Sequence, residues 1–278
     1  MPNYFQQIEL AFGCNPTYNF FTIHFEHPYD IAKLDASIRE GILRYELHMR
    51  YYRMAMQWIG YPHAIHTVGS SFALLASAYA KQGGMNRRKA GEDFYFLHKL
   101  VLLGHYGNIH STTVFPSARQ SDRVPFGTGA AMKKWIEGSS ELNFTYPLAA
   151  FINLKPLFSN ASQFWQMNPA EIENMILRLH PTLKSFCENS LVIEKLLELK
   201  KNCSSALVFE RRVFHLLDAF WILKYLNFSR ERSYPFADLQ SEAANLLQHI
   251  GVQCEINSTL ENLLEIFRDL DRRVENCS

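Results

Sequence analysis

Residues 83–100, GGMNRRKAGEDFYFLHKL, place two adjacent acids, Glu92 and Asp93, directly after a glycine and before an apolar run. Gly91 lets the backbone turn sharply, so both acids fall in the first turn of a predicted helix over 92–103. Free amide N–H groups at a helix start stabilise carboxylates and hold them ionised. A fixed, ionised carboxylate can take the proton of a hydroxyl as its oxygen attacks. The pair therefore predicts a general base, and the simpler alternative is ordinary charge at a helix start.

A second group of residues lies in the segment 117–129, SARQSDRVPFGTG. Arg119 and Arg123 are four residues apart, and Gly127, Thr128 and Gly129 precede a predicted helix over 130–136. Guanidinium groups and the amides of a helix N-terminus both bind anions, and together they suit a diphosphate. The alternative is a surface loop with a glycine-rich turn.

A third pair, Gly69 and Ser70, interrupts a predicted strand over 64–75. A glycine within a strand often marks the close approach of a ligand or of another backbone, and it marks a bulge at least as often. We expect this pair to contact the acceptor if Glu92 and Asp93 at the start of the later helix are catalytic.

Two other acidic patterns are discounted as metal sites. In HFEH, residues 24–27, His27 faces away from His24 and Glu26 on a strand, so the three side chains do not converge. Asp269 and Asp271 form an acid-x-acid pattern within a charged amphipathic helix, for which we expect a solvated face of ion pairs. No metal ligands are predicted in this chain. The chain also lacks a GxSxG elbow, a Walker loop, HExxH and GxGxxG, which argues against several hydrolase, phosphotransferase and dehydrogenase classes.

In the first half of the chain, both strands and helices are predicted to position these groups. Residues 20–25, FFTIHF, predict a buried strand, which ends before Pro28. Asp30 is the expected N-cap of a long amphipathic helix that ends near Gly60, and Arg50 is expected on its polar face. A short helix over 76–82 and a short strand over 112–115 follow. Beyond about residue 138 the apolar periodicity is almost wholly helical, with helices expected over 191–200, 207–226, 239–250 and 260–270. We therefore predict a mixed α/β domain over 1–138 and a helical domain over 139–278.

The totals describe an ordinary globular chain of 278 residues, 47% apolar and 20% charged, with a net charge of +1. No basic stripe predicts nucleic-acid binding, and no apolar stretch is long enough to span a membrane. The five cysteines are scattered and odd in number, which is typical of a reducing compartment, and no signal peptide is apparent. We therefore expect a cytoplasmic protein.

Taken in order, several segments resemble the second half of bacterial family 2 glycosyltransferases. These segments are NYFQQIELAF (3–12), HFEHP (24–28), HTVGS (66–70), AY (78–79), GGM (83–85), AGEDFYF (90–96) and SDRVPFGTG (121–129). The likeness covers about residues 3–135 and extends weakly into the helical half, for instance over RRVFHLLDAFWILKYL (211–226).

The resemblance implies part of a glycosyltransferase-A type α/β domain, which transfers a sugar from a nucleotide-activated donor to an acceptor hydroxyl. In that family the Asp of the Glu-Asp pair is the general base of an inverting transfer, which corresponds here to Asp93, with Glu92 beside it. The departing diphosphate needs positive charge, for which Arg119 and Arg123 are the candidates from their chemistry. No QxxRW motif of processive synthases occurs, so non-processive transfer is expected.

This sequence also departs from the family pattern. The donor-binding half, with its acid-x-acid motif for Mg²⁺ or Mn²⁺, is expected before Asn3, and Leu75 stands where a basic residue is expected. We therefore expect a truncated transferase. In one form of this hypothesis, a separate chain supplies the donor-binding half. The alternative is a degenerate, non-catalytic transferase whose helical half binds a partner or a membrane surface.

Overall fold

The computed structural model describes residues 3–31, 34–85, 91–121, 127–255 and 258–273. The chain is mixed α/β and forms two compact units. The first unit comprises Met1–Tyr51, Ile65–Asn143 and Gln253–Ser278, and the second comprises Tyr52–Ala64 and Phe144–Val252. Each unit is discontinuous in sequence, whereas the predicted domains 1–138 and 139–278 are each continuous.

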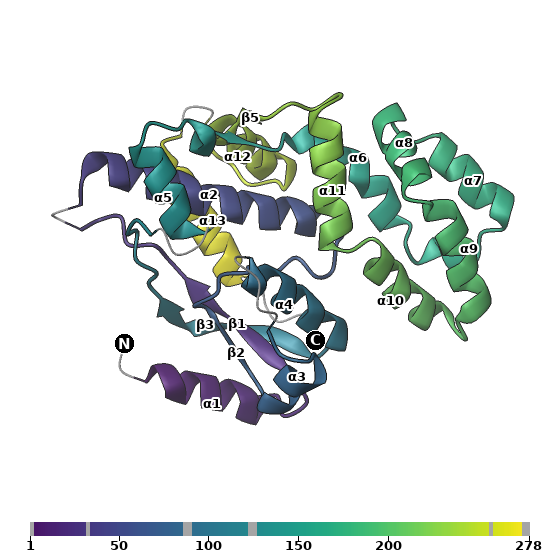
Figure 1. Cartoon of the computed structure of the whole chain (residues 1–278), viewed down its shortest axis with the longest axis horizontal. Coiled ribbons are helices and arrows are strands. Elements are labelled where there is room, and N and C mark those ends of the chain that lie inside the picture. Colours follow the sequence, from purple (N-terminus) through teal and green to yellow (C-terminus); the bar gives the residue numbers. More distant parts are fainter. Residues whose placement is uncertain (1–2, 32–33, 86–90, 122–126, 256–257, 274–278) are drawn as a thin grey trace. The chain divides into compact units, whose positions relative to one another are not determined.

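The first unit is built on a three-stranded sheet (Figure 1). Its strands are β1 (Phe20–Phe25), β2 (Phe72–Leu74) and β3 (Tyr106–Val114), in the order β2-β1-β3. β1 is antiparallel to β2 and parallel to β3, with a register shift after Ile23. The sheet therefore has one antiparallel and one parallel pair, and β1 lies at its centre.

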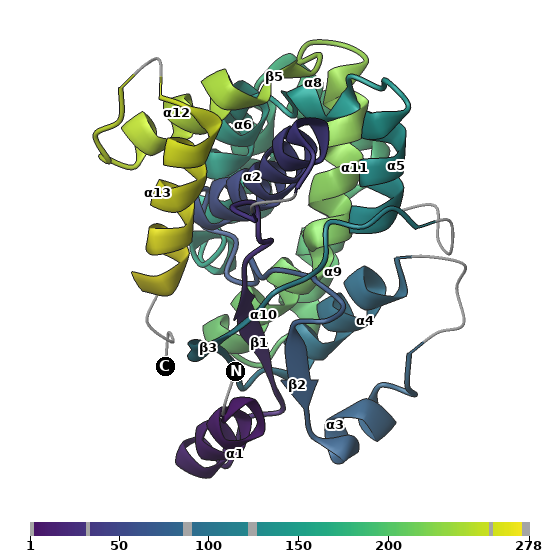
Figure 2. The same ribbon diagram turned by 90° about the vertical axis from the view of Figure 1, so that its left-hand side faces the viewer.

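Helices cover both faces of this sheet because alternate residues of β1 point to opposite sides. Phe21 and Ile23 pack against α1 (Tyr4–Cys14). Phe20 packs on the other face in a cluster with residues of α3 (Ala76–Lys81) and α4 (Glu92–Leu100). Figure 2 shows α1 and α4 on opposite sides of the strands. All six residues of β1 are buried in consequence, as the apolar run FFTIHF predicted.

Two further helices bear on function in the first unit, and one of them, α2, belongs to this unit only up to Tyr51. α2 (Ala36–Trp58) begins later than predicted, and Asp35, not Asp30, caps its start by accepting a hydrogen bond of 2.8 Å from the N–H of Ser37. α13 (Leu260–Arg273) contacts α2 through an ion pair of 2.8 Å between Arg268 and Glu46. This contact explains why the C-terminal segment belongs to the first unit.

The second unit is helical apart from a short antiparallel pair, β4 (Phe144–Thr145) and β5 (Ala237–Asp238). Its helices are α6 (Leu148–Ser159), α7 (Pro169–Leu177), α8 (Pro181–Asn189), α9 (Val192–Asn202), α10 (Ala206–Leu216), α11 (Ala219–Arg230) and α12 (Leu239–His249). The predicted helix over 207–226 is therefore wrong as a single element. It divides at Asp218, which accepts a hydrogen bond from the N–H of Trp221 and so begins a new helix.

The predicted strand over 64–75 is also wrong for most of its length. Only Phe72–Leu74 is extended in the sheet, and Gly69 and Ser70 form a turn before it. The strand predicted over 112–115 is the end of the longer β3. Among the described residues, none of the helices combines the length and the apolar character needed to cross a membrane.

Candidate functional site

A cavity of about 620 Å³ opens in the first unit, and most of the predicted site residues line it. Its walls come from the turn before β2, the start of α4, the segment after β3 and the start of α5 (Thr128–Ile136). The predicted residues that it brings together are Gly69, Ser70, Glu92, Asp93, Arg119, Gly127, Thr128 and Gly129. Its volume is within the range of pockets for small molecules.

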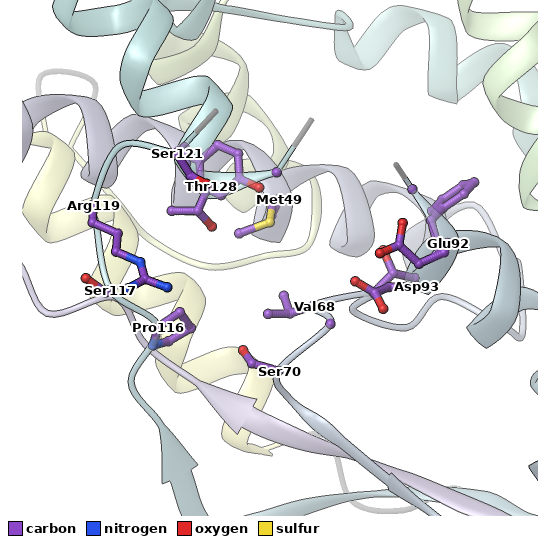
Figure 3. A pocket seen from close by; sticks show the side chains of 17 residues that line it. Met49, Val68, Ser70, Glu92, Asp93, Pro116, Ser117, Arg119, Ser121 and Thr128 are labelled. Atoms are coloured by element: carbon purple, nitrogen blue, oxygen red, sulfur yellow. The ribbon is translucent and has the colours of Figure 1, made fainter. Parts of the chain in front are cut away.

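Asp93 enters this cavity from the first turn of α4, as the sequence predicted. Gly91 adopts φ 73°, a left-handed conformation that turns the chain into the helix, and Glu92 and Asp93 follow it. Figure 3 shows both carboxylates on one side of the cavity. The glycine and the two acids therefore lie at the start of the helix, on the cavity wall.

The pKa of Asp93 is shifted in the direction opposite to the sequence-based expectation. Burial, and then the neighbouring charge of Glu92, raise the pKa of Asp93 above its usual value. The amides at the helix start were expected to hold the carboxyl ionised, and the loss of solvation outweighs them. A carboxylate with a raised pKa is a better proton acceptor, because its pKa lies closer to that of the working solution.

Arg119 lies on the opposite wall of the cavity, in the segment that leaves β3 (Figure 3). Its side chain is exposed, and the start of α5 stands beside it with Gly127, Thr128 and Gly129 on the cavity wall. Gly127 has φ 90°, a conformation that favours glycine. The cavity thus has an acidic side and a side with a cation and helix amides, while the predicted Arg123 lies outside the described residues.

The segment that carries Arg119 is held against α5 by a close backbone contact. The N–H of Ser121 donates to the carbonyl of Gly129 over 3.2 Å. A Cβ on Gly129 would lie 2.4 Å from the Cβ of Ser121 and 3.0 Å from its backbone nitrogen. Packing against Ser121 therefore requires a glycine at residue 129. The sequence predicted only an anion-binding role for Gly129.

Gly69 is required for the position of the candidate base. A Cβ at residue 69 would lie 1.9 Å from Oδ2 of Asp93, so the carboxylate rests directly against the glycine backbone. The sequence predicted a close approach at this glycine and attributed it to an acceptor or a backbone. The group that approaches is the Asp93 side chain, and Ser70 next to it lines the cavity.

Behind the cavity lies a buried cluster of charged side chains that the sequence analysis did not identify. Glu46 of α2 is fully buried and bonds to Arg50 and to Arg268, each at 2.8 Å. Its Oε2 also accepts the backbone N–H of His27 over 2.7 Å and faces Nδ1 of that ring at 3.0 Å. Burial alone would raise the pKa of Glu46, but these hydrogen bonds and charges hold it well below its usual range.

Two sequence-based interpretations fail in this cluster. Arg50 was placed on the polar face of its helix, yet it is fully buried and pairs with Glu46 and Asp271. The segment of Asp271 was expected to be a solvated ion-pair face, yet Asp271 and Arg268 are each only 4% exposed. The α13 helix is buried against α2 on this side, whereas Asp269 and Arg272 follow the expectation and form an exposed ion pair.

The described residues hold no group of three or more His, Cys, Asp or Glu placed to bind a metal ion. His24 and Glu26 contact each other at 2.8 Å, while His27 points to Glu46 and Thr128, so HFEH divides between two faces as predicted. The ligand set for Mg²⁺ or Mn²⁺ that the resemblance implies is therefore not formed by the part of the chain described here.

Comparison with known proteins yields no relative for this site. No protein-family model matches the chain, and neither a curated protein nor a solved structure matches it.

Proposed function

We propose that the first unit carries the acceptor site and the catalytic base of a sugar transfer from a nucleotide-activated donor, with inversion and without processive elongation. The fold proposed for it is part of a glycosyltransferase-A type domain. The observation that carries the proposal is the placement of Asp93 and Arg119 on opposite walls of one cavity.

In the proposed reaction, the acceptor hydroxyl lies against Asp93, in the part of the cavity next to Ser70. Asp93 takes the hydroxyl proton as the oxygen attacks the anomeric carbon of the donor. Its raised pKa supports this role, because the carboxylate is more basic than that of an exposed Asp. Glu92 raises the basicity of its neighbour by charge and is a candidate for holding the acceptor.

The departing nucleoside diphosphate carries the negative charge that develops in the transfer. Arg119 and the first amides of α5 are the groups proposed to receive it, with Thr128 in the same turn. Arg123 remains a candidate for the same role. A divalent ion would be bound by the donor-binding part, which we propose to lie outside the described residues. One form of this proposal is that a separate chain supplies that part.

The test is a transfer assay on the complete protein in its natural host, isolated with any chain that copurifies. Nucleotide sugars are supplied with Mn²⁺ or Mg²⁺, and the glycosylated product and the released nucleotide are identified by mass spectrometry. Product formation that depends on Asp93 supports the proposal. The competing proposal, a non-catalytic binding module, predicts that Asp93→Asn leaves the biological activity intact.

A further inference from the structure

Three side chains from three separate segments form a hydrogen-bonded row that ends at the cavity. Glu46 of α2 faces His27 Nδ1 at 3.0 Å, and His27 Nε2 faces Thr128 Oγ1 at 3.3 Å. Glu46 and His27 are at most 1% exposed, whereas Thr128, the first residue of α5, lines the cavity. The row therefore leads from a buried carboxylate to a hydroxyl that a ligand can reach.

The direction of the protons in this row follows from the ionised state of Glu46. A carboxylate can only accept hydrogen bonds, so Nδ1 of His27 carries a hydrogen and donates it. In the neutral ring Nε2 is then without a hydrogen and accepts the hydroxyl proton of Thr128. The hydroxyl of Tyr45 is also in hydrogen-bond contact with Thr128. The imidazole is thus oriented to withdraw the proton of Thr128.

The buried charge cluster packs against His27. Arg268 also donates to the carbonyl of His27 over 3.0 Å, which fixes the backbone of that residue. At the edge of the cluster, His24 contacts Glu26, His66 contacts Asp271, and the more exposed Arg272 pairs with Glu26.

The surroundings of Thr128 suit an attack on a carbonyl group. The amides of the first turn of α5 lack the partners that later turns have, and they can receive the negative charge that forms on a carbonyl oxygen. Arg119 stands on the same side of the cavity and can bind an anionic group of the ligand. The cavity of about 620 Å³ accommodates a small ester or thioester.

We propose that Thr128 is a nucleophile of acyl transfer, with His27 as its general base and Glu46 as the positioning residue for the imidazole. Oγ1 of Thr128 attacks the ester carbonyl, and its proton passes to Nε2 of His27. The carbonyl carbon–oxygen bond to the alcohol breaks, and the alcohol leaves with that proton. Water then attacks the acyl-threonine through the same base, which releases the acid and restores the hydroxyl. This proposal does not rest on the proposed sugar transfer, although both use the same cavity.

The experiment uses the full-length protein and p-nitrophenyl acetate as the acyl donor. Released p-nitrophenol is followed over time, and acetylated positions are located by peptide mass spectrometry before and after hydroxylamine, which cleaves esters and leaves acetyl-lysine. The variants are Thr128→Val, which keeps the shape without the hydroxyl, Thr128→Ser, His27→Gln and Glu46→Gln. Ser117→Ala is the matched control, because Ser117 is another hydroxyl on the cavity wall.

The proposal expects a hydroxylamine-labile acetyl group on Thr128 that is lost in Thr128→Val and retained in Thr128→Ser and Ser117→Ala. His27→Gln is expected to slow acetylation by roughly 10²–10⁴-fold, the usual contribution of a positioned base. Glu46→Gln should lower kcat per folded molecule, with the folded fraction measured by circular dichroism, while the KM for the ester is unchanged. Correction for the folded fraction separates loss of imidazole positioning from loss of fold. Acetylation confined to lysines, or an equal rate in Thr128→Val, overturns the proposal even if the His27 variant fails to fold.

Discussion

The carboxylate of Asp93 rests against the backbone of Gly69, so closely that a Cβ at residue 69 would lie 1.9 Å from Oδ2. The glycine belongs to the turn before β2 and the acid to the first turn of α4, which meet at the cavity wall. The absence of a side chain at Gly69 thus allows Asp93, the candidate base, to occupy its position.

Gly69→Ala is therefore predicted to displace the base without unfolding the protein. The carboxylate is the end of a side chain and can move, so the fold is retained. A displacement of about 1 Å at a catalytic group lowers the rate by roughly 10²-fold. The transfer rate and the melting temperature of the variant are the measurements. Gly13→Ala is the control, because no atom lies within 4 Å of a Cβ there; a Gly69→Ala variant with the wild-type rate would contradict the prediction.

Asp93→Asn is predicted to leave the folded state at least as stable as the wild type at pH 7. The folded-state pKa of Asp93 is raised, so the folded environment disfavours its ionised form, and the stability of the wild type falls as the pH rises through that pKa. An uncharged Asn avoids this cost. Thermal unfolding at pH 4 and pH 7 measures the difference in stability between wild type and Asp93→Asn. A variant markedly less stable than wild type at pH 7 would show that Asp93 forms a stabilising ion pair instead.

Glu46→Gln is predicted to destabilise the protein by about 3–5 kcal/mol at pH 7, because two buried guanidinium groups lose a charged partner. The folded-state pKa of Glu46 is depressed, so its contribution is present above the unfolded value of about 4.3 and is lost as the pH falls below it. The difference between wild type and variant in urea unfolding should therefore shrink between about pH 5 and pH 2.

The matched control for that measurement lies on the same helix. Glu40 and Arg44 form another i,i+4 pair at 2.8 Å, but the Glu40 side chain is 48% exposed. Exposed pairs of this kind contribute about 0.3–0.5 kcal/mol, so Glu40→Gln should change the free energy of unfolding by no more than that. Equal losses in the two variants would refute the assignment of Glu46 as the centre of a buried cluster.

Arg119→Ala is predicted to weaken the binding of inorganic pyrophosphate about tenfold, the worth of one charged hydrogen bond of ~1.5 kcal/mol. Because the Arg119 side chain is exposed, the effect should decrease as salt is added. Isothermal titration calorimetry measures the affinity for pyrophosphate and its dependence on salt. Arg212→Ala is the control, because Arg212 is an exposed arginine of the second unit. Binding that does not respond to Arg119 would remove this residue from the anion site.

The sequence predicted the cavity residues better than the elements that carry them. Gly91, Glu92 and Asp93 follow a local rule, in which a glycine turn and acids begin a helix, and the structure places them so. The strand predicted over 64–75 was wrong because its apolar residues fit a strand by composition, while Gly69 forms a turn against a side chain that is distant in sequence.

The buried charge cluster could not be predicted in the same way. Glu46 and Arg50 have the spacing of an exposed helical ion pair, and nothing in the local pattern distinguishes a buried one. Their burial depends on Arg268 and Asp271, more than 200 residues later, and on the packing of α13 against α2. Such long-range pairing is tertiary information that helical periodicity does not contain.

The most direct test of the account is the rate of sugar transfer by the complete protein carrying Asp93→Asn, compared with wild type at matched donor occupancy. The account predicts a loss of roughly two to four orders of magnitude in rate with unchanged affinity for the donor. Glu92→Gln and Gly13→Ala, prepared in parallel, separate this loss from a change of local charge or of folding. An Asp93→Asn protein that transfers sugar within threefold of the wild-type rate would contradict the claim that Asp93 is the base.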